Sequence, residues 1–260
     1  MFLLVLSEIS LILGAYFYVY PGVARLYWLW PLQALAARFL GAIFLSIPFG
    51  CWSALREPLW QRGKILVLVG AIFFGLTSIV SVIQPVQNNI LQWVWTTYFV
   101  AASAGCLIIL GRHGWKRRPQ DLLRNGTAPS TARIFLRVQT VIVALFGTLL
   151  FIFPDLSRAQ FWPWKVGSPN LQIFGALFLA TCLATGWASI QRDLRRITVL
   201  LPIDAAFPSL ALLAVALHWN VIAAESPSPV VTIVWLGLYS VVATGALLVY
   251  LRARTTVQNH

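Results

Sequence analysis

A run of small residues recurs inside two long apolar stretches of the chain. Each run places a small side chain at every fourth position over about three helical turns. The two runs are Ala42, Ser46, Gly50 and Ala54 in the first half, and Ala176, Ala180, Ala184 and Ala188 in the second. An internal repeat constrains the architecture more than any single motif, because each copy has to form the same structural unit.

Proline and tryptophan repeat in the same order as the small residues. Pro21 followed by Trp30-Pro31 returns as Pro154 followed by Trp162-Pro163, and Val94-Trp95 and Arg112 return as Val234-Trp235 and Arg252. These matches predict two tandem copies of one unit.

The composition is typical of a membrane protein. Of 260 residues, 59% are hydrophobic and 10% are charged, and the mean hydropathy is +0.80, whereas a soluble domain carries roughly 25% charged residues. The cysteines are Cys51, Cys106 and Cys182. An odd, widely spaced set predicts neither a disulfide framework nor a metal site.

Eight stretches are long enough to cross the hydrocarbon core, which takes about 20 apolar residues. They are 2–20, 35–55, 65–84, 90–111, 134–153, 171–190, 197–217 and 230–250. We therefore expect an all-α integral membrane protein. The first stretch lacks the preceding basic residue of a signal peptide and has a counterpart in the second copy, so we expect it to be retained.

The basic residues predict the orientation. Fifteen of the 19 Lys and Arg fall in the loops 56–64, 112–137 and 191–196 or in the C-terminal tail, which the positive-inside rule places in the cytoplasm. None of the twelve tryptophans lies at a predicted midplane, as their preference for interfaces requires. Both termini are then cytoplasmic, and we expect a cell membrane, the bacterial plasma membrane, as the location.

The spans divide into two repeats of four. We expect a first repeat at 1–111, a basic cytoplasmic linker at 112–133, a second repeat at 134–252 and a cytoplasmic tail at 253–260. Because four is even, both copies enter the membrane in the same direction. They should be related by a pseudo-twofold axis along the membrane normal.

The small-residue runs and the first outer loop of each repeat are candidate packing devices. Small residues let helix backbones approach closely in lipid. Either the second and sixth spans meet near the axis, or each run packs inside its own bundle. The loops 21–33 and 154–170 carry Trp28, Trp30, Trp162 and Trp164. These indoles suggest interfacial anchors, with a lid or lipid-contacting platform as the alternative.

Asp204 is the strongest candidate for a functional side chain, because ionisable groups inside membranes are rare and costly. Pro202 and Pro208 flank it, and each frees a backbone carbonyl. A carboxylate beside interrupted backbone can form an ion site. Alternatively, Asp204 simply pairs with one of the nearby arginines Arg192, Arg195 and Arg196. We expect this ion pair, and an Asp204 facing a cavity without a basic partner would favour a transporter or binder.

Two other charges lie within predicted spans. Glu8 lies about two turns into the first span and is either functional, neutral or paired with a basic group such as Arg137. Arg38 starts the second span near its outer end, from which a long basic side chain can reach the surface as an anchor.

No residue pattern predicts catalysis or a cofactor. His113 and His218 lie at span ends and His260 is terminal, so no facing histidines are available for haem. We find no candidate metal cluster, nucleophile set or phosphate-binding loop, and catalysis needs cooperating groups.

Three functions remain, in order of preference. The first is a non-enzymatic scaffold or accessory subunit, the second a transporter or binder of an apolar or amphipathic molecule or lipid at the repeat interface, and the third a membrane-embedded enzyme. The expected partners are membrane lipids, with anionic lipid at the cytoplasmic basic loops, and other membrane subunits. Nucleic acid is excluded, because the charge follows membrane topology.

Overall fold

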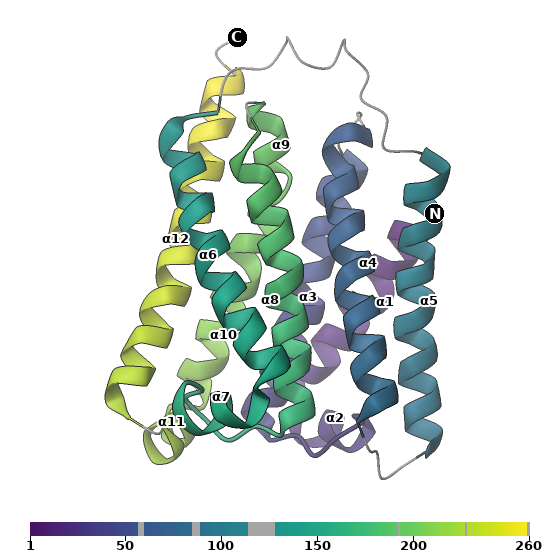
Figure 1. The fold of residues 1–260 in the computed structure, drawn as a ribbon, viewed down its shortest axis with the longest axis vertical. Helices are drawn as coiled ribbons and strands as arrows, with labels where there is room; N and C mark the ends of the chain where they lie inside the picture. Colours follow the sequence, from purple (N-terminus) through teal and green to yellow (C-terminus); the bar gives the residue numbers. More distant parts are fainter. Residues whose placement is uncertain (57–59, 85–88, 114–127, 192, 227, 259–260) are drawn as a thin grey trace.

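The structure, a computed structural model, is a bundle of helices (Figure 1). The structure describes all residues except 57–59, 85–88, 114–127, 192, 227 and 259–260. Within the described chain, eight helices are long and apolar enough to cross a membrane, which confirms the predicted spans. The helices that form these spans are α1 (Phe2–Val19), α3 (Ala34–Arg56), α4 (Trp60–Ile83), α5 (Asn89–His113), α6 (Ser130–Ile152), α8 (Ser168–Ser189), α10 (Leu201–Leu217) and α12 (Pro229–Gln258). The seventh span begins before α10, at Arg196, and ends at Leu217.

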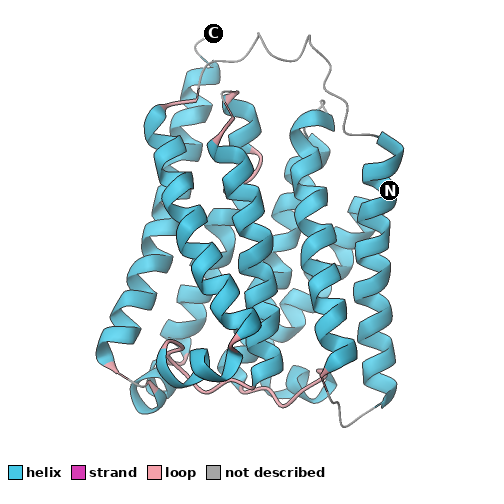
Figure 2. Cartoon of the chain, in the orientation of Figure 1, coloured by secondary structure: helices cyan, strands magenta, loops and turns pink. Residues whose placement is uncertain are grey.

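Short helical segments connect several of the long helices (Figure 2). They are α2 (Pro21–Ala24), the 3-10 turn η1 (Arg25–Tyr27), α7 (Pro154–Gln160), α9 (Leu194–Thr198) and α11 (Trp219–Glu225). Pro21 and Pro154 each occupy the first position of their helix, where a missing amide hydrogen costs nothing. α2, α7 and α11 lie at the end of the bundle opposite the C-terminal end of α12 (Figure 1).

The seventh span differs from the single kinked helix that the sequence suggested. α9 ends at Thr198, a turn follows, and α10 begins at Leu201 with Pro202 in its first turn. Proline favours this position because it has no amide hydrogen to pair. The break places Asp204 in the first turn of α10.

α3 and α8 are the most buried of the long helices. α3 packs on α1 and α8 packs on α6, whereas α4 pairs with α5 and α10 with α12. In addition, α3 packs on α10 and α8 packs on α4. The central helices therefore join the first half of the chain to the second.

Two glycines at matched positions in the two halves allow close helix contacts. A Cβ atom placed on Gly41 would lie 2.7 Å from the amide nitrogen of Tyr18 in α1. The same construction on Gly175 places it 2.7 Å from the amide nitrogen of Phe151 in α6. Both contacts bring backbone against backbone, so only glycine fits without a shift of the helices.

The small-residue run on α3 contacts helices of both halves of the chain. Ala54 lies against Gly63 of α4, in the same half. α3 and α8 touch through the rings of Phe39 and Phe174, whose centroids are 4.6 Å apart, but their main packing partners are other helices. Gly50, in the run on α3, contacts Ile203 of α10 in the other half. Small-residue spacing identified faces that approach another helix, but it could not identify the partner.

The outer faces of the long helices carry large exposed apolar side chains, such as Ile79, Val141 and Val241. An apolar outer surface on long apolar helices suits the hydrocarbon core of a bilayer. The chain is thus a multi-pass membrane protein with eight candidate spans.

Candidate functional site

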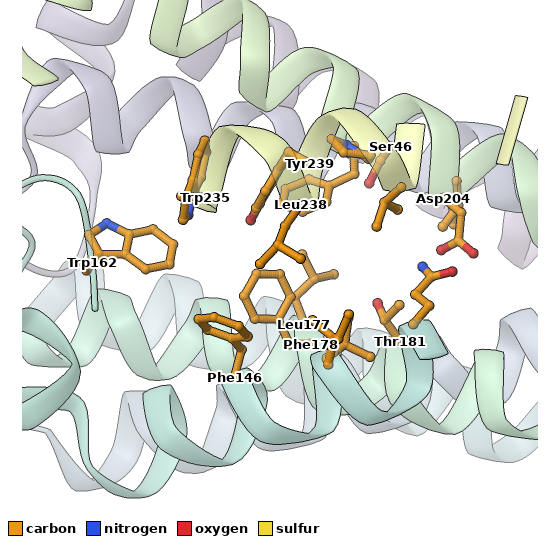
Figure 3. Close-up of a pocket in the computed structure, with 17 residues that line it drawn as sticks. Ser46, Phe146, Trp162, Leu177, Phe178, Thr181, Asp204, Trp235, Leu238 and Tyr239 are labelled. Atoms are coloured by element: carbon orange, nitrogen blue, oxygen red, sulfur yellow. The ribbon is translucent and has the colours of Figure 1, made fainter. Parts of the chain in front are cut away.

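A cavity of about 90 Å³ lies among α6, α8, α10 and α12 (Figure 3). Ser46 of α3 and Trp162 of the loop after α7 complete its wall. We call it the Asp204 cavity, because Asp204 carries the one carboxylate in its lining. Figure 3 shows Trp162 at one end of the cavity and Asp204 at the other, with Leu177, Phe178 and Leu238 between them.

The local sequence of α10 directs Asp204 inward. α10 packs between α3 and α12, and the Asp204 side chain on its inner face is 6% exposed. Pro208 lies one turn further along the same helix. Since Pro208 has no amide hydrogen, the backbone carbonyl of Asp204 lacks its usual helical donor.

Gln139 of α6 is the hydrogen-bonding partner of Asp204. The second carboxylate oxygen, Asp204 Oδ2, and the amide oxygen, Gln139 Oε1, have no partner among the described residues. Gln139 is 3% exposed. Two buried acceptor atoms thus meet at one end of the cavity.

We expected Asp204 to pair with Arg192, Arg195 or Arg196, and of these only Arg196 has a described side chain, which does not pair with Asp204. The Arg196 Nε lies 3.6 Å from Asp193 Oδ2, and its Nη1 donates to Gln191 Oε1 at 3.0 Å. Arg192 and the side chain of Arg195 lie outside the described residues. Within the part that is described, no basic group lies within ion-pair distance of Asp204.

The rest of the wall is largely aromatic. Trp235 and Tyr239 of α12 stack with centroids 4.0 Å apart and an angle of 19° between their planes. Phe146, Phe178 and Phe207 add further rings. The Trp162 Nε1 and the Tyr239 hydroxyl line the cavity and have no hydrogen-bond partner among the described residues.

Gln139 and Tyr239 were not predicted from the sequence as residues of the site. The only available signal was that each is a polar group inside an apolar span, and single polar residues are common there. The fold, which brings α6, α10 and α12 together, is what gathers both side chains around Asp204.

The other charged candidates lie outside the cavity. Glu8 is exposed on α1, and among the described contacts it forms no ion pair with Arg137, which is also exposed. Arg38 is half-buried, and its Nη1 lies 3.4 Å from Nδ1 of His218. Arg38 thus links α3 to the end of α10, in addition to any role as a surface anchor.

The four loop tryptophans are buried. Trp28, Trp30, Trp162 and Trp164 are all less than 5% exposed. Trp28 packs edge-on against Trp95 with centroids 4.6 Å apart, and Trp164 packs edge-on against Trp235 at 5.1 Å. The predicted interfacial anchors are therefore not these indoles. Exposed rings in the same loops are Tyr27 and Phe161.

The described residues contain no group of three or more His, Cys, Asp or Glu that could hold a metal ion. Cys51, Cys106 and Cys182 are free thiols. His113 and His218 lie at helix ends, and His260 lies outside the described residues. Asp204 is the one residue of these four types in the lining of the cavity.

Comparison with known proteins gives no match: no family model, curated protein or solved structure is similar to this chain.

Proposed function

We propose that the protein binds an amphipathic small molecule in the Asp204 cavity, as a membrane-embedded binder or transporter. The observation that carries this proposal is that Asp204 is buried at a cavity wall without a basic partner among the described residues. Burying an unpaired carboxylate is costly. A scaffold gains nothing from that cost, whereas a binding site uses it to recognise a ligand.

The chemistry of the wall supports an amphipathic occupant. Ligand sites are mostly apolar and carry a few polar groups that fix orientation. The Asp204 cavity has aromatic and aliphatic side chains along its length and unpaired polar atoms at Asp204, Gln139, Tyr239 and Trp162. It lies mainly within the second half of the chain, with Ser46 as the contribution from the first.

The slight packing between α6 and α12 supports entry of the ligand from the bilayer. α6 and α12 both line the cavity but pack only slightly on each other. The lining residues Ile142, Phe146, Leu238 and Val242 on these helices are half-buried. A molecule dissolved in the membrane would reach the cavity between α6 and α12.

Two adjacent valines provide a test. Val242 lines the cavity, whereas Val241 is 63% exposed on the outer face of the same helix. Val242→Trp should fill the cavity, and Val241→Trp adds the same bulk outside it. We expect mass spectrometry of protein purified in mild detergent to find a small molecule with wild type and with Val241→Trp, and to find it depleted with Val242→Trp. Equal amounts in all three samples, or none in any, would contradict the proposal.

The scaffold remains the second candidate, and the same purification addresses it. A protein that co-elutes stoichiometrically with both valine variants would favour an accessory subunit. We further propose anionic lipid as a partner of the basic loops, which predicts co-purified anionic lipid that high salt removes.

We also infer that the two halves form repeats related by a pseudo-twofold axis along the membrane normal. Matched contacts support this inference. Gly41 meets Tyr18 as Gly175 meets Phe151, and the α3–α10 contact matches α8–α4. Residues 2–111 and 134–252 of an experimental structure should superpose by rotation about this axis, and inverted halves would disprove it.

The proposed orientation places both termini and the linker in the cytoplasm. It rests on the distribution of Lys and Arg. A Gln120→Cys variant, made without the three native cysteines, should resist an impermeant thiol reagent in intact cells and react after permeabilisation. Labelling in intact cells would show that the linker lies outside the cytoplasm and that the proposed orientation is wrong.

A further inference from the structure

The polar end of the Asp204 cavity presents acceptors rather than donors. Asp204 Oδ2 and Gln139 Oε1 are unpaired, and both side chains are more than nine-tenths buried. The Ser46 hydroxyl, also in the wall, already donates to the backbone carbonyl of Ile43 at 2.7 Å. A group that satisfies this end must therefore bring hydrogen-bond donors of its own.

The charges of the lining residues narrow the chemical class of the ligand further. The lining contains one carboxylate and no Lys or Arg, so an anionic group at the Asp204 end would be repelled. A cationic group would gain a charge-assisted hydrogen bond to Asp204.

The cavity is elongated, and a ligand that spans it has to widen the 90 Å³ that the structure shows by separating α6 from α12, which pack only slightly on each other. Its lining on α6 runs from Gln139 to Phe146, which corresponds to about 10 Å along the helix. Aromatic side chains occupy the end opposite Asp204 (Figure 3). This end suits an apolar, preferably aromatic, body.

We infer that the ligand is an arylalkylamine or a similar apolar amine about 10 Å long, with its ammonium group on Asp204 and Gln139 and its body along the aromatic wall. The inference rests on the proposed function, because it names the chemical class that the same cavity accepts. The competing explanation is that a proton on the Asp204 carboxyl neutralises it, and this leaves no preference for an amine.

Three probes of matched shape separate these explanations: 4-phenylbutylamine, 4-phenylbutan-1-ol and 4-phenylbutyrate. Titration calorimetry on the full chain in detergent measures their dissociation constants, with Val242→Trp protein as the background for micelle partitioning. We expect wild type to bind the amine at least about tenfold more tightly than the alcohol, as one charge-assisted hydrogen bond provides. The carboxylate should bind more weakly than both.

Asp204→Asn should remove the preference for the amine while leaving the affinity for the alcohol within about twofold of wild type. Glu8→Gln is the matched control, because it removes a carboxylate from an exposed position on α1 and should change nothing. If Asp204→Asn does not yield monodisperse protein, Gln139→Leu takes its place. It should weaken amine binding several-fold and spare the alcohol.

Equal affinity for amine and alcohol in wild type, or an amine preference that survives Asp204→Asn, would overturn the inference. If both probes bind equally and Val242→Trp abolishes the binding, the cavity is a ligand site with a different specificity, and the proposed function stands. If no probe binds above the Val242→Trp background, the inference is wrong, and the mass spectrometry on the valine variants decides the proposed function separately.

Discussion

The indole nitrogen Nε1 of Trp28 donates a hydrogen bond to Oδ1 of Asn170 over 2.7 Å. Asn170 in turn donates through Nδ2 to the backbone carbonyl of Pro31 at 3.1 Å. The Asn170 side chain is 2% exposed. One buried amide therefore connects the loop between η1 and α3 to the start of α8, across the two halves of the chain.

Replacing this amide should destabilise the fold. Asn170→Leu leaves the Trp28 indole and the Pro31 carbonyl without partners, and each buried unpaired group costs about 1–3 kcal/mol. We expect the melting temperature in detergent to fall by several degrees. Asn220→Leu, at an exposed position on α11, should change the free energy of unfolding by less than about 0.5 kcal/mol. Equal effects of the two substitutions would show that the Asn170 bonds contribute nothing.

The glycine contacts give a second prediction. Gly41→Ala and Gly175→Ala each place a methyl group against the backbone of a neighbouring helix, so each should cost about 1–3 kcal/mol through forced separation of the helices. Nothing lies within 4 Å of a Cβ atom on Gly237. Gly237→Ala should therefore be neutral or slightly stabilising, since alanine favours helix. Thermal unfolding of the three variants in one detergent measures the difference, and wild-type stability of Gly41→Ala would refute the close contact.

Much of this fold could be predicted because bilayer thickness dictates it. Every crossing helix needs about 20 apolar residues, so the eight spans are visible in the sequence. The inward direction of Trp28 and Trp162 is not visible, because the protein interior and the surrounding lipid are both apolar. Hydrophobicity therefore does not separate a buried face from a lipid-facing one.

The candidate site was predictable only in part. Asp204 was identified because a carboxylate in an apolar span is rare. Its partner, Gln139, comes from a helix remote in sequence, and only the packing of α6 near α10 reveals it. Arg196, one of the three arginines expected to pair with Asp204, instead lies 3.6 Å from Asp193, which precedes it by one turn.

Tyr18 provides a third prediction, about the contact between α1 and α10. Its hydroxyl donates to the backbone carbonyl of Leu210 over 2.7 Å, two residues beyond Pro208. Hydrogen bonds between membrane helices contribute about 0.6–1.7 kcal/mol. Tyr18→Phe should lower the free energy of unfolding by that amount. Tyr20→Phe, which alters a 61% exposed ring next to the same helix, should have no effect. A Tyr18→Phe protein that unfolds like wild type would mean that the bond does not form in the membrane.

The pairing of Arg38 with His218 predicts a pH dependence. His218 lies just beyond the seventh span. Burial and the positive charge of Arg38 lower the pKa of His218 below its ordinary value of 6.5, and a hydrogen bond to the Ala214 carbonyl opposes them by a smaller amount. The unfolded chain therefore binds a proton at pH values where the folded protein does not. Stability due to this group is present above pH 6.5 and is lost as the pH falls through that value towards the lower pKa of the folded state.

Melting temperatures of wild type at neutral pH and at about pH 5.5, which is below the ordinary pKa of histidine, measure this effect. We expect His218→Gln to reduce the loss of stability on acidification, because it removes the group that must stay uncharged beside Arg38. Arg38→Gln should also reduce it, by removing the neighbouring charge. His113→Gln changes an exposed histidine on α5 and should leave the wild-type pH dependence in place. If His218→Gln and His113→Gln behave alike, the contact between Arg38 and His218 does not control the response to pH.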